Sequence, residues 1–311
     1  MDAKPTPPHS ARRHARTRRG WPGKSKPRWA APWLLLRETA QAWYSDDVPT
    51  LAAAIAFYTV FSLAPSLMIA VGVAGIVTGE PAARSQLITV IAQVIGPRAS
   101  EFMRIILQDA SFSEAGPLLT LTGVGLAFIG AAAVFVELQS ALNKIWDAAA
   151  KPGHALRSIL YTRVLSFLIV VGIGLLLLVS LAVSAAYSMA DSAFSSRFPL
   201  PPAIFEGLNF LLSLLLLTTL VAAVYRVVPN VDIDWSDVWI GALVTSLLMI
   251  AAKFLIGVYL ANSGLRYIYG AASALVTILL WVYFSVQIFL LGAEFTRVYA
   301  THYGSRIRPA T

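Results

Sequence analysis

The chain contains six long intervals of apolar residues that hold very few charged side chains. An α-helix rises about 1.5 Å per residue, so about 20 apolar residues cross the hydrocarbon core of a bilayer, which is about 30 Å thick. Only 13% of the residues are charged, whereas soluble domains carry about 25%. We therefore predict an all-α polytopic membrane protein with six transmembrane helices. These predicted helices cover residues 51–78, 118–141, 164–188, 204–225, 238–260 and 271–297.

Lysine and arginine are distributed unequally between the two sides that these helices define. Eighteen of them lie in the two tails and in the loops on the same side, and five lie on the opposite side. Because positively charged segments stay in the cytoplasm, both chain ends are predicted to be cytoplasmic. The resulting organisation is a disordered basic tail over residues 1–32, a membrane domain over 33–299 and a cytoplasmic C-terminal tail over 300–311.

About 40 residues separate the first two predicted membrane helices on the external side, too many for a simple loop. Two sets of apolar residues in this segment follow helical spacing: Leu87, Val90, Ile91 and Val94, and then Phe102, Ile105 and Ile106. A Gly-Pro pair at 96–97 separates them. We predict two amphipathic helices that lie on the outer surface or cap the bundle.

The basic N-terminal tail has three interpretations. Ten lysines and arginines occur up to and including Arg37, and anionic lipid headgroups attract such a cluster. Nonspecific binding of nucleic acid is the second interpretation, but no folded nucleic-acid-binding motif accompanies the tail. A twin-arginine export signal is the third, although "TRRGWPG" is followed by prolines and charges instead of an apolar segment. We expect contact with anionic membrane lipids and no specific nucleic acid.

Lys253 lies inside the fifth predicted helix, about seven residues and hence about 10 Å from its outer end. A charge at this depth is costly and marks a functional position unless it escapes to the interface. Glu206, Asn209 and Ser213 of the fourth helix share one face and start from the same outer edge. We predict a polar site in which Lys253 meets Glu206 or Asn209, directly or through water. The alternative is that the lysine stem carries its ammonium group toward the headgroups and has no further role.

The first predicted membrane helix has Tyr58, Ser62 and Pro65 on one side, which we expect to face the bundle interior. Pro65 removes a backbone hydrogen bond and should kink the helix unless its neighbours compensate. This side is therefore either an ordinary packing face of a bent helix or part of a broken-helix binding site.

The sixth predicted helix carries Tyr283, Gln287 and Glu294 within about 40° of one another, at 100° per residue. Such a polar face is expected inside the bundle. Glu294 lies about one turn from the cytoplasmic end, so it is either a hydrated interfacial carboxylate or a proton-relay group.

Four stretches of the sequence carry a resemblance to a known family. They are "DDVPTLAAAIAFYTVFSLAPSLMI" from Asp46, "ALNKIWDA" from Ala141, "VPNVDIDWSDVWIGAL" from Val228 and "YGAASALVTILLWVYFSVQIFLLGAEF" from Tyr269. Together they resemble the YihY/BrkB (YhjD-like) family of bacterial inner-membrane proteins over about residues 33–299. The resemblance implies six membrane helices with both ends in the cytoplasm, and it transfers no catalytic residue.

Members of this family were once labelled ribonuclease BN. Hydrolysis of RNA needs positioned acid/base groups or carboxylates that bind metal ions. The cytoplasmic carboxylates of Asp232, Asp234 and Asp237 do not have the spacing of a recognisable metal-binding loop. We therefore disfavour the ribonuclease interpretation and expect a protein that is not an enzyme.

The chain has no cysteine, and its four histidines lie in the tails or in a loop, so we expect no metal or other cofactor. Lys253, Pro65 and the external amphipathic segment favour transport-like handling of a lipid or another amphiphile in the cell envelope. The alternative is a membrane scaffold or assembly protein, in which the polar residues only determine how the helices pack.

Overall fold

The computed structural model describes residues 31–94, 104, 107, 117–148, 202–304 and 308–309. The helices in these residues are α1 (Ala31–Ser45), α2 (Val48–Thr78), α3 (Glu80–Val94), α5 (Pro117–Ile145), α7 (Pro202–Val227), α8 (Trp235–Asn262), α9 (Leu265–Tyr269), η2 (Gly270–Ala272) and α10 (Ser273–His302). The strands β1 (Val231–Asp232) and β2 (Arg308–Pro309) pair antiparallel. Among the described residues, three segments are long and apolar enough to cross a membrane, namely Phe210–Val227, Trp235–Asn262 and Ser273–His302, and Val48–Leu63 is a shorter apolar helix. The predicted class, an all-α membrane protein, is confirmed.

Five of the six predicted membrane segments lie in α2, α5, α7, α8 and α10, except that the first two residues of the segment 271–297 belong to η2. The third predicted segment, the basic tail up to residue 30 and most of the second predicted amphipathic face lie outside the described residues. Several helices are longer than predicted; α10, for example, continues to His302. The prediction located each segment by an interval almost free of charge, whereas a helix continues past such an interval because charged side chains can project from its last turns into the interface.

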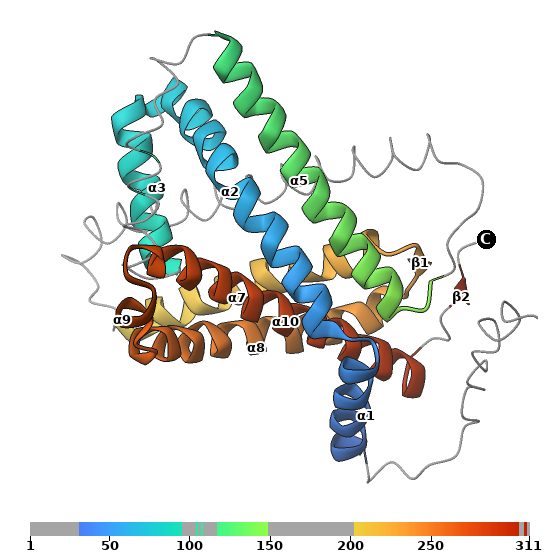
Figure 1. Cartoon of the computed structure of the whole chain (residues 1–311). Helices are drawn as coiled ribbons and strands as arrows, with labels where there is room; N and C mark the ends of the chain where they lie inside the picture. Colours follow the sequence, from blue (N-terminus) through green and yellow to red (C-terminus); the bar gives the residue numbers. More distant parts are fainter. Residues whose placement is uncertain are drawn as a thin grey trace, which may run out of the picture.

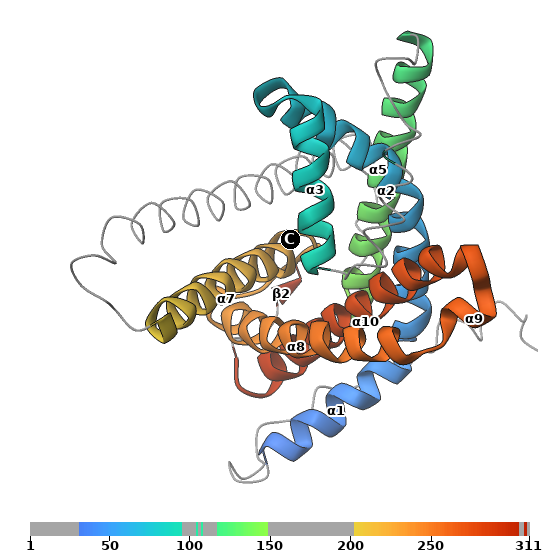
Figure 2. The ribbon, with the colours of Figure 1, turned by 90° about the vertical axis from the view of Figure 1, so that its left-hand side faces the viewer.

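The helices form two groups that cross each other (Figure 1). In one group α2 and α5 pack side by side, and in the other α7, α8 and α10 form a layer that α2 crosses at α10. The quarter-turn view in Figure 2 shows the same crossing, with α1 projecting from the end of the bundle where it joins α2. The first predicted amphipathic helix is α3, which turns back so that Leu87 and Ile88 pack with Met68 and Val71 of α2.

Packing is tightest at the end of the bundle where α1 joins α2, which we call the α1 end. The largest buried cluster lies there and includes Val48, Leu142, Tyr225, Val238 and Leu290, all of them at most 1% exposed. Apolar side chains are exposed along the whole of α8, and the most exposed of them, Phe254 and Leu255, lie toward its opposite end. Exposed apolar side chains on a membrane helix face lipid without the cost that they have in water.

Two glycines let α8 and α10 approach closely. A Cβ on Gly241 would lie 1.9 Å from Oγ1 of Thr296, and a Cβ on Gly292 would lie 2.0 Å from Oγ1 of Thr245. Each threonine hydroxyl donates a hydrogen bond to the carbonyl of the glycine in its own helix, at 2.7 Å in both cases. The contact is therefore reciprocal, and its buried hydroxyls are satisfied within their own helices.

Candidate functional site

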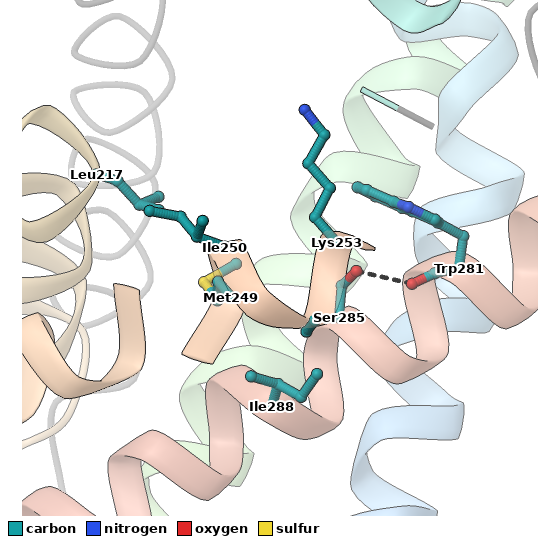
Figure 3. Close-up of a pocket in the computed structure, with 8 residues that line it drawn as sticks. Leu217, Met249, Ile250, Lys253, Trp281, Ser285 and Ile288 are labelled. Atoms are coloured by element: carbon teal, nitrogen blue, oxygen red, sulfur yellow. Dashed lines mark hydrogen bonds between the residues drawn. The ribbon is translucent and has the colours of Figure 1, made fainter. Parts of the chain in front are cut away.

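Lys253 lines a groove of about 290 Å³ between α7, α8 and α10 (Figure 3). The other lining residues are mostly apolar: Leu217, Met249, Ile250, Ala252, Trp281, Ser285 and Ile288. The Ser285 hydroxyl donates a hydrogen bond to the Trp281 carbonyl at 2.7 Å, so this polar group is satisfied internally. The Lys253 ammonium group, in contrast, forms no ion pair or hydrogen bond with any residue in the described part of the chain. As far as the described residues go, the groove thus combines apolar walls with a cation that has no partner among them.

The position of Lys253 on α8 explains its exposure. Ala252 and Ile256 are buried against α10, while Phe254 and Leu255 are exposed on the outer face. Lys253 lies between these two faces, and Figure 3 shows its stem rising away from the α10 backbone beside Trp281. The stem can therefore cover apolar surface while the ammonium group stays accessible.

The groove also shows how α7 and α8 are aligned. Leu217 of α7 lies beside Ile250 of α8 (Figure 3), and Tyr225 further along α7 meets Thr245, earlier in α8, at 3.2 Å. The two helices are therefore antiparallel.

This alignment places Ser213 at the level of Lys253. At 1.5 Å per residue, Asn209 and Glu206 lie about 6 and about 10 Å further along α7 than Ser213. The side chains of Asn209 and Glu206 are outside the described residues, so their contact with Lys253 stays a prediction. The register makes Ser213 the nearest and Glu206 the most distant of the three.

The residues singled out on the first membrane helix lie in different environments. Ser62 is buried, and a Cβ on Gly130 of α5 would lie 2.7 Å from its Cβ, so Ser62 belongs to the α2–α5 packing contact. Tyr58, expected inside the bundle, is instead 37% exposed and contacts Phe57 edge-on. The two residues lie about one helical turn apart on α2, and the close approach of Gly130 covers Ser62. Helix α2 continues through Pro65, whose side chain is outside the described residues.

The polar residues of the sixth membrane helix become more buried toward the α1 end. Tyr283 and Gln287 are half-buried, and Glu294 is fully buried. Of the two interpretations offered by the sequence for Glu294, the hydrated interfacial carboxylate does not agree with this burial.

Arg297 is the centre of an ionic network at the α1 end, and the sequence did not single it out. Its guanidinium group lies 2.9 Å from Glu294 Oε2 and 3.4 Å from carboxylate oxygens of both Asp46 and Asp147. Lys144 donates a hydrogen bond to the backbone carbonyl of Asp46 and adds a second cation. The network joins the start of α2, the end of α5 and the end of α10. The only local signal was the i, i+3 spacing of Glu294 and Arg297.

A model of the family described as Virulence factor BrkB matches residues 39–311. The chain belongs to the BrkB family. Among the relatives are UPF0761 membrane proteins of Pseudomonas paraeruginosa, 29% identical over 83% of this chain, of Delftia acidovorans, 28% over 85%, and of Neisseria meningitidis serogroup B, 26% over 86%. The matches cover 60%, 62% and 62% of those proteins, so the chain spans about three fifths of their length. No solved structure matches this chain.

The four stretches that carry the BrkB resemblance meet at the α1 end. Three of them supply the carboxylates of Asp46, Asp147 and Glu294 that surround Arg297. The fourth, from Val228, is tied to the second stretch, because the Asn143 side chain accepts a hydrogen bond from the Asn230 amide at 2.8 Å. In this BrkB-family chain the four stretches therefore share one packed end of the bundle, and the stretch from Tyr269 also supplies Trp281, Ser285 and Ile288 of the Lys253 groove.

Proposed function

We propose that this protein is an integral protein of the bacterial inner membrane, with both chain ends cytoplasmic, that binds an anionic amphiphile in the Lys253 groove. The handling of that amphiphile is transport-like, and the protein is not an enzyme. The observation that carries the proposal is the exposed Lys253 ammonium group above apolar groove walls. The excess of basic residues on the side of the two tails supports the orientation.

The chemistry of the groove favours a lipid-like ligand. A lysine at membrane depth costs about 2.5–3.5 kcal/mol unless it gains a partner or water, and an anionic headgroup would offset that cost. The walls formed by Leu217, Ile250 and Ile288 suit an acyl chain. The volume of about 290 Å³ is at the lower limit of ligand pockets, which hold about 300–1,000 Å³. The groove thus fits one chain of an amphiphile better than a complete lipid.

Replacing Lys253 with methionine should lower the retention of anionic lipid on the purified protein about tenfold. The reason is the loss of one charge-assisted contact, worth about 1.5 kcal/mol. Native mass spectrometry of the protein released from nanodiscs with equal amounts of phosphatidylglycerol and phosphatidylethanolamine measures the bound lipid. Lys253→Arg keeps the charge and is the matched control that should retain lipid. Equal lipid retention by the Met variant and the unmodified protein would exclude the groove as the binding site.

Because the chain has no cysteine, a single cysteine can report whether water reaches the groove. In proteoliposomes, Lys253→Cys should react with a membrane-impermeant maleimide, since transport-like handling needs a hydrated path to this position. Phe254→Cys is the matched control: Phe254 is 72% exposed but lies outside the groove lining, and lipid should protect it. If both cysteines stay unreactive and Lys253→Met binds lipid normally, the scaffold interpretation replaces transport.

A further inference from the structure

Helix α1 has two different faces. Its inner face packs on α10, with Thr39 and Ala42 buried and Glu38 paired with His302. Its outer face carries an apolar stripe at i, i+3, i+7 and i+11, which consists of Trp33, Leu36, Ala40 and Tyr44. Trp33, Leu36 and Tyr44 are 74%, 60% and 81% exposed. Exposure of three large apolar side chains on one helix face usually marks an interaction surface.

The outer face is shaped as a shallow groove of about 550 Å³, and its edge is polar. Arg37 and Gln41 line this groove together with the apolar stripe. No element within the described residues packs over the stripe, and α1 projects from the bundle (Figure 1). The surface is therefore available to something outside the described part of the chain.

The connection between α1 and α2 positions this face at a membrane boundary. Only Asp46 and Asp47 separate the two helices, and Asp47 adopts a left-handed conformation with φ of 55°. Such a conformation interrupts the helical path, so that α2 starts in a new direction. The apolar part of α2 begins immediately afterwards, at Leu51. Helix α1 is thus joined by a tight turn to the point where α2 enters the hydrocarbon.

We propose that α1 lies in the plane of an anionic membrane surface, with the Trp33–Leu36–Ala40–Tyr44 stripe in the boundary between headgroups and acyl chains. Tryptophan and tyrosine favour this boundary because their rings are apolar and their tips are polar. Arg37 beside the stripe and nine lysines and arginines in residues 1–30 provide the complementary charge for anionic headgroups. The proposal does not depend on a ligand in the Lys253 groove, so the two can fail separately.

An environment-sensitive fluorophore on single cysteines in the full-length chain tests this placement. Leu36→Cys puts the probe in the stripe, and Gln41→Cys puts it on the polar edge of the same helix, about 140° away. In nanodiscs that contain phosphatidylglycerol, we expect the Leu36 probe to be several-fold less quenched by iodide than the Gln41 probe, and strongly quenched by spin-labelled lipid. Equal iodide quenching at both positions would overturn the proposal.

A separate measurement tests whether the basic residues attract α1 to anionic lipid. Deleting residues 1–30 should reduce the protection of the Leu36 probe in phosphatidylglycerol nanodiscs more than in phosphatidylcholine nanodiscs. Raising the ionic strength from 0.1 to 1 M shortens the Debye length from about 10 to about 3 Å and should have the same effect. If iodide quenching of the Leu36 probe does not change with lipid charge, tail deletion or salt, recognition of anionic lipid is contradicted. If the Leu36 probe is protected from iodide but is not quenched by spin-labelled lipid, and the protein has the mass of a dimer, the outer face of α1 binds a second copy of the chain instead.

Discussion

Gly292→Ala should destabilise the folded protein by about 3 kcal/mol, near the upper end of the range for overpacked cores. The new Cβ would lie 2.0 Å from Oγ1 and 2.7 Å from Cγ2 of Thr245. Thr245 is fully buried, and its hydroxyl is held by the Gly241 carbonyl at 2.7 Å and by the Tyr225 hydroxyl at 3.2 Å. The threonine therefore cannot rotate away without losing these contacts, and α8 and α10 must separate. Thermal or denaturant unfolding in detergent measures the loss.

A second glycine in α8 provides the matched control. Gly257 has nothing within 4 Å of the Cβ that alanine would add. Gly257→Ala should leave stability unchanged or raise it by up to about 1 kcal/mol, because alanine is the better helix former. Combining Gly292→Ala with Thr245→Ala removes the clashing Oγ1 and Cγ2, so the double variant should be more stable than the sum of the two single losses predicts. Equal effects of the two glycine substitutions would refute the close-packing account.

Arg297→Met should cost about 3–5 kcal/mol of stability, the usual penalty for removing one partner of a buried ion pair. Glu294 is fully buried, with 0% of its surface exposed, and the Arg297 guanidinium group 2.9 Å away is its ion-pair partner. Without Arg297 the carboxylates of Glu294 and Asp46 would lie near each other without the cation between them. The measurement is again the free energy of unfolding in detergent.

Two further variants separate a buried pair from a surface pair. Asp147→Asn removes a partner whose side chain is 85% exposed and 3.4 Å from Arg297, so it should cost less than about 1 kcal/mol. Glu294→Gln combined with Arg297→Met removes the unpaired charge and should recover much of the lost stability. If Arg297→Met has near-normal stability, or if the double variant recovers no stability, the network does not hold the α1 end together.

These two contacts lie in the tightly packed half of the molecule, and the Lys253 groove lies beyond them. The reciprocal Gly–Thr pair and the Arg297 network tie α2, α5, α8 and α10 together at one end. The half of α8 that contains Lys253 has fewer buried residues than the half at the α1 end. A bundle held rigidly at one end can open at the other without losing its core, which is the behaviour that the proposed handling of an amphiphile needs.

The sequence by itself determined the class of this protein and the approximate positions of the five membrane helices that the structure describes, whereas the role of Lys253 stays a prediction. These properties are local, because hydrophobicity over about 20 consecutive residues decides whether a segment crosses a membrane. Only the tertiary structure decided which side chains meet. Arg297 and Asp147 are 150 residues apart in sequence, and the positions of Ser213 and Glu206 relative to Lys253 follow from the register of α7 against α8. Register and crossing depend on the fit of two helix surfaces to each other, and that fit is absent from the composition of either helix alone.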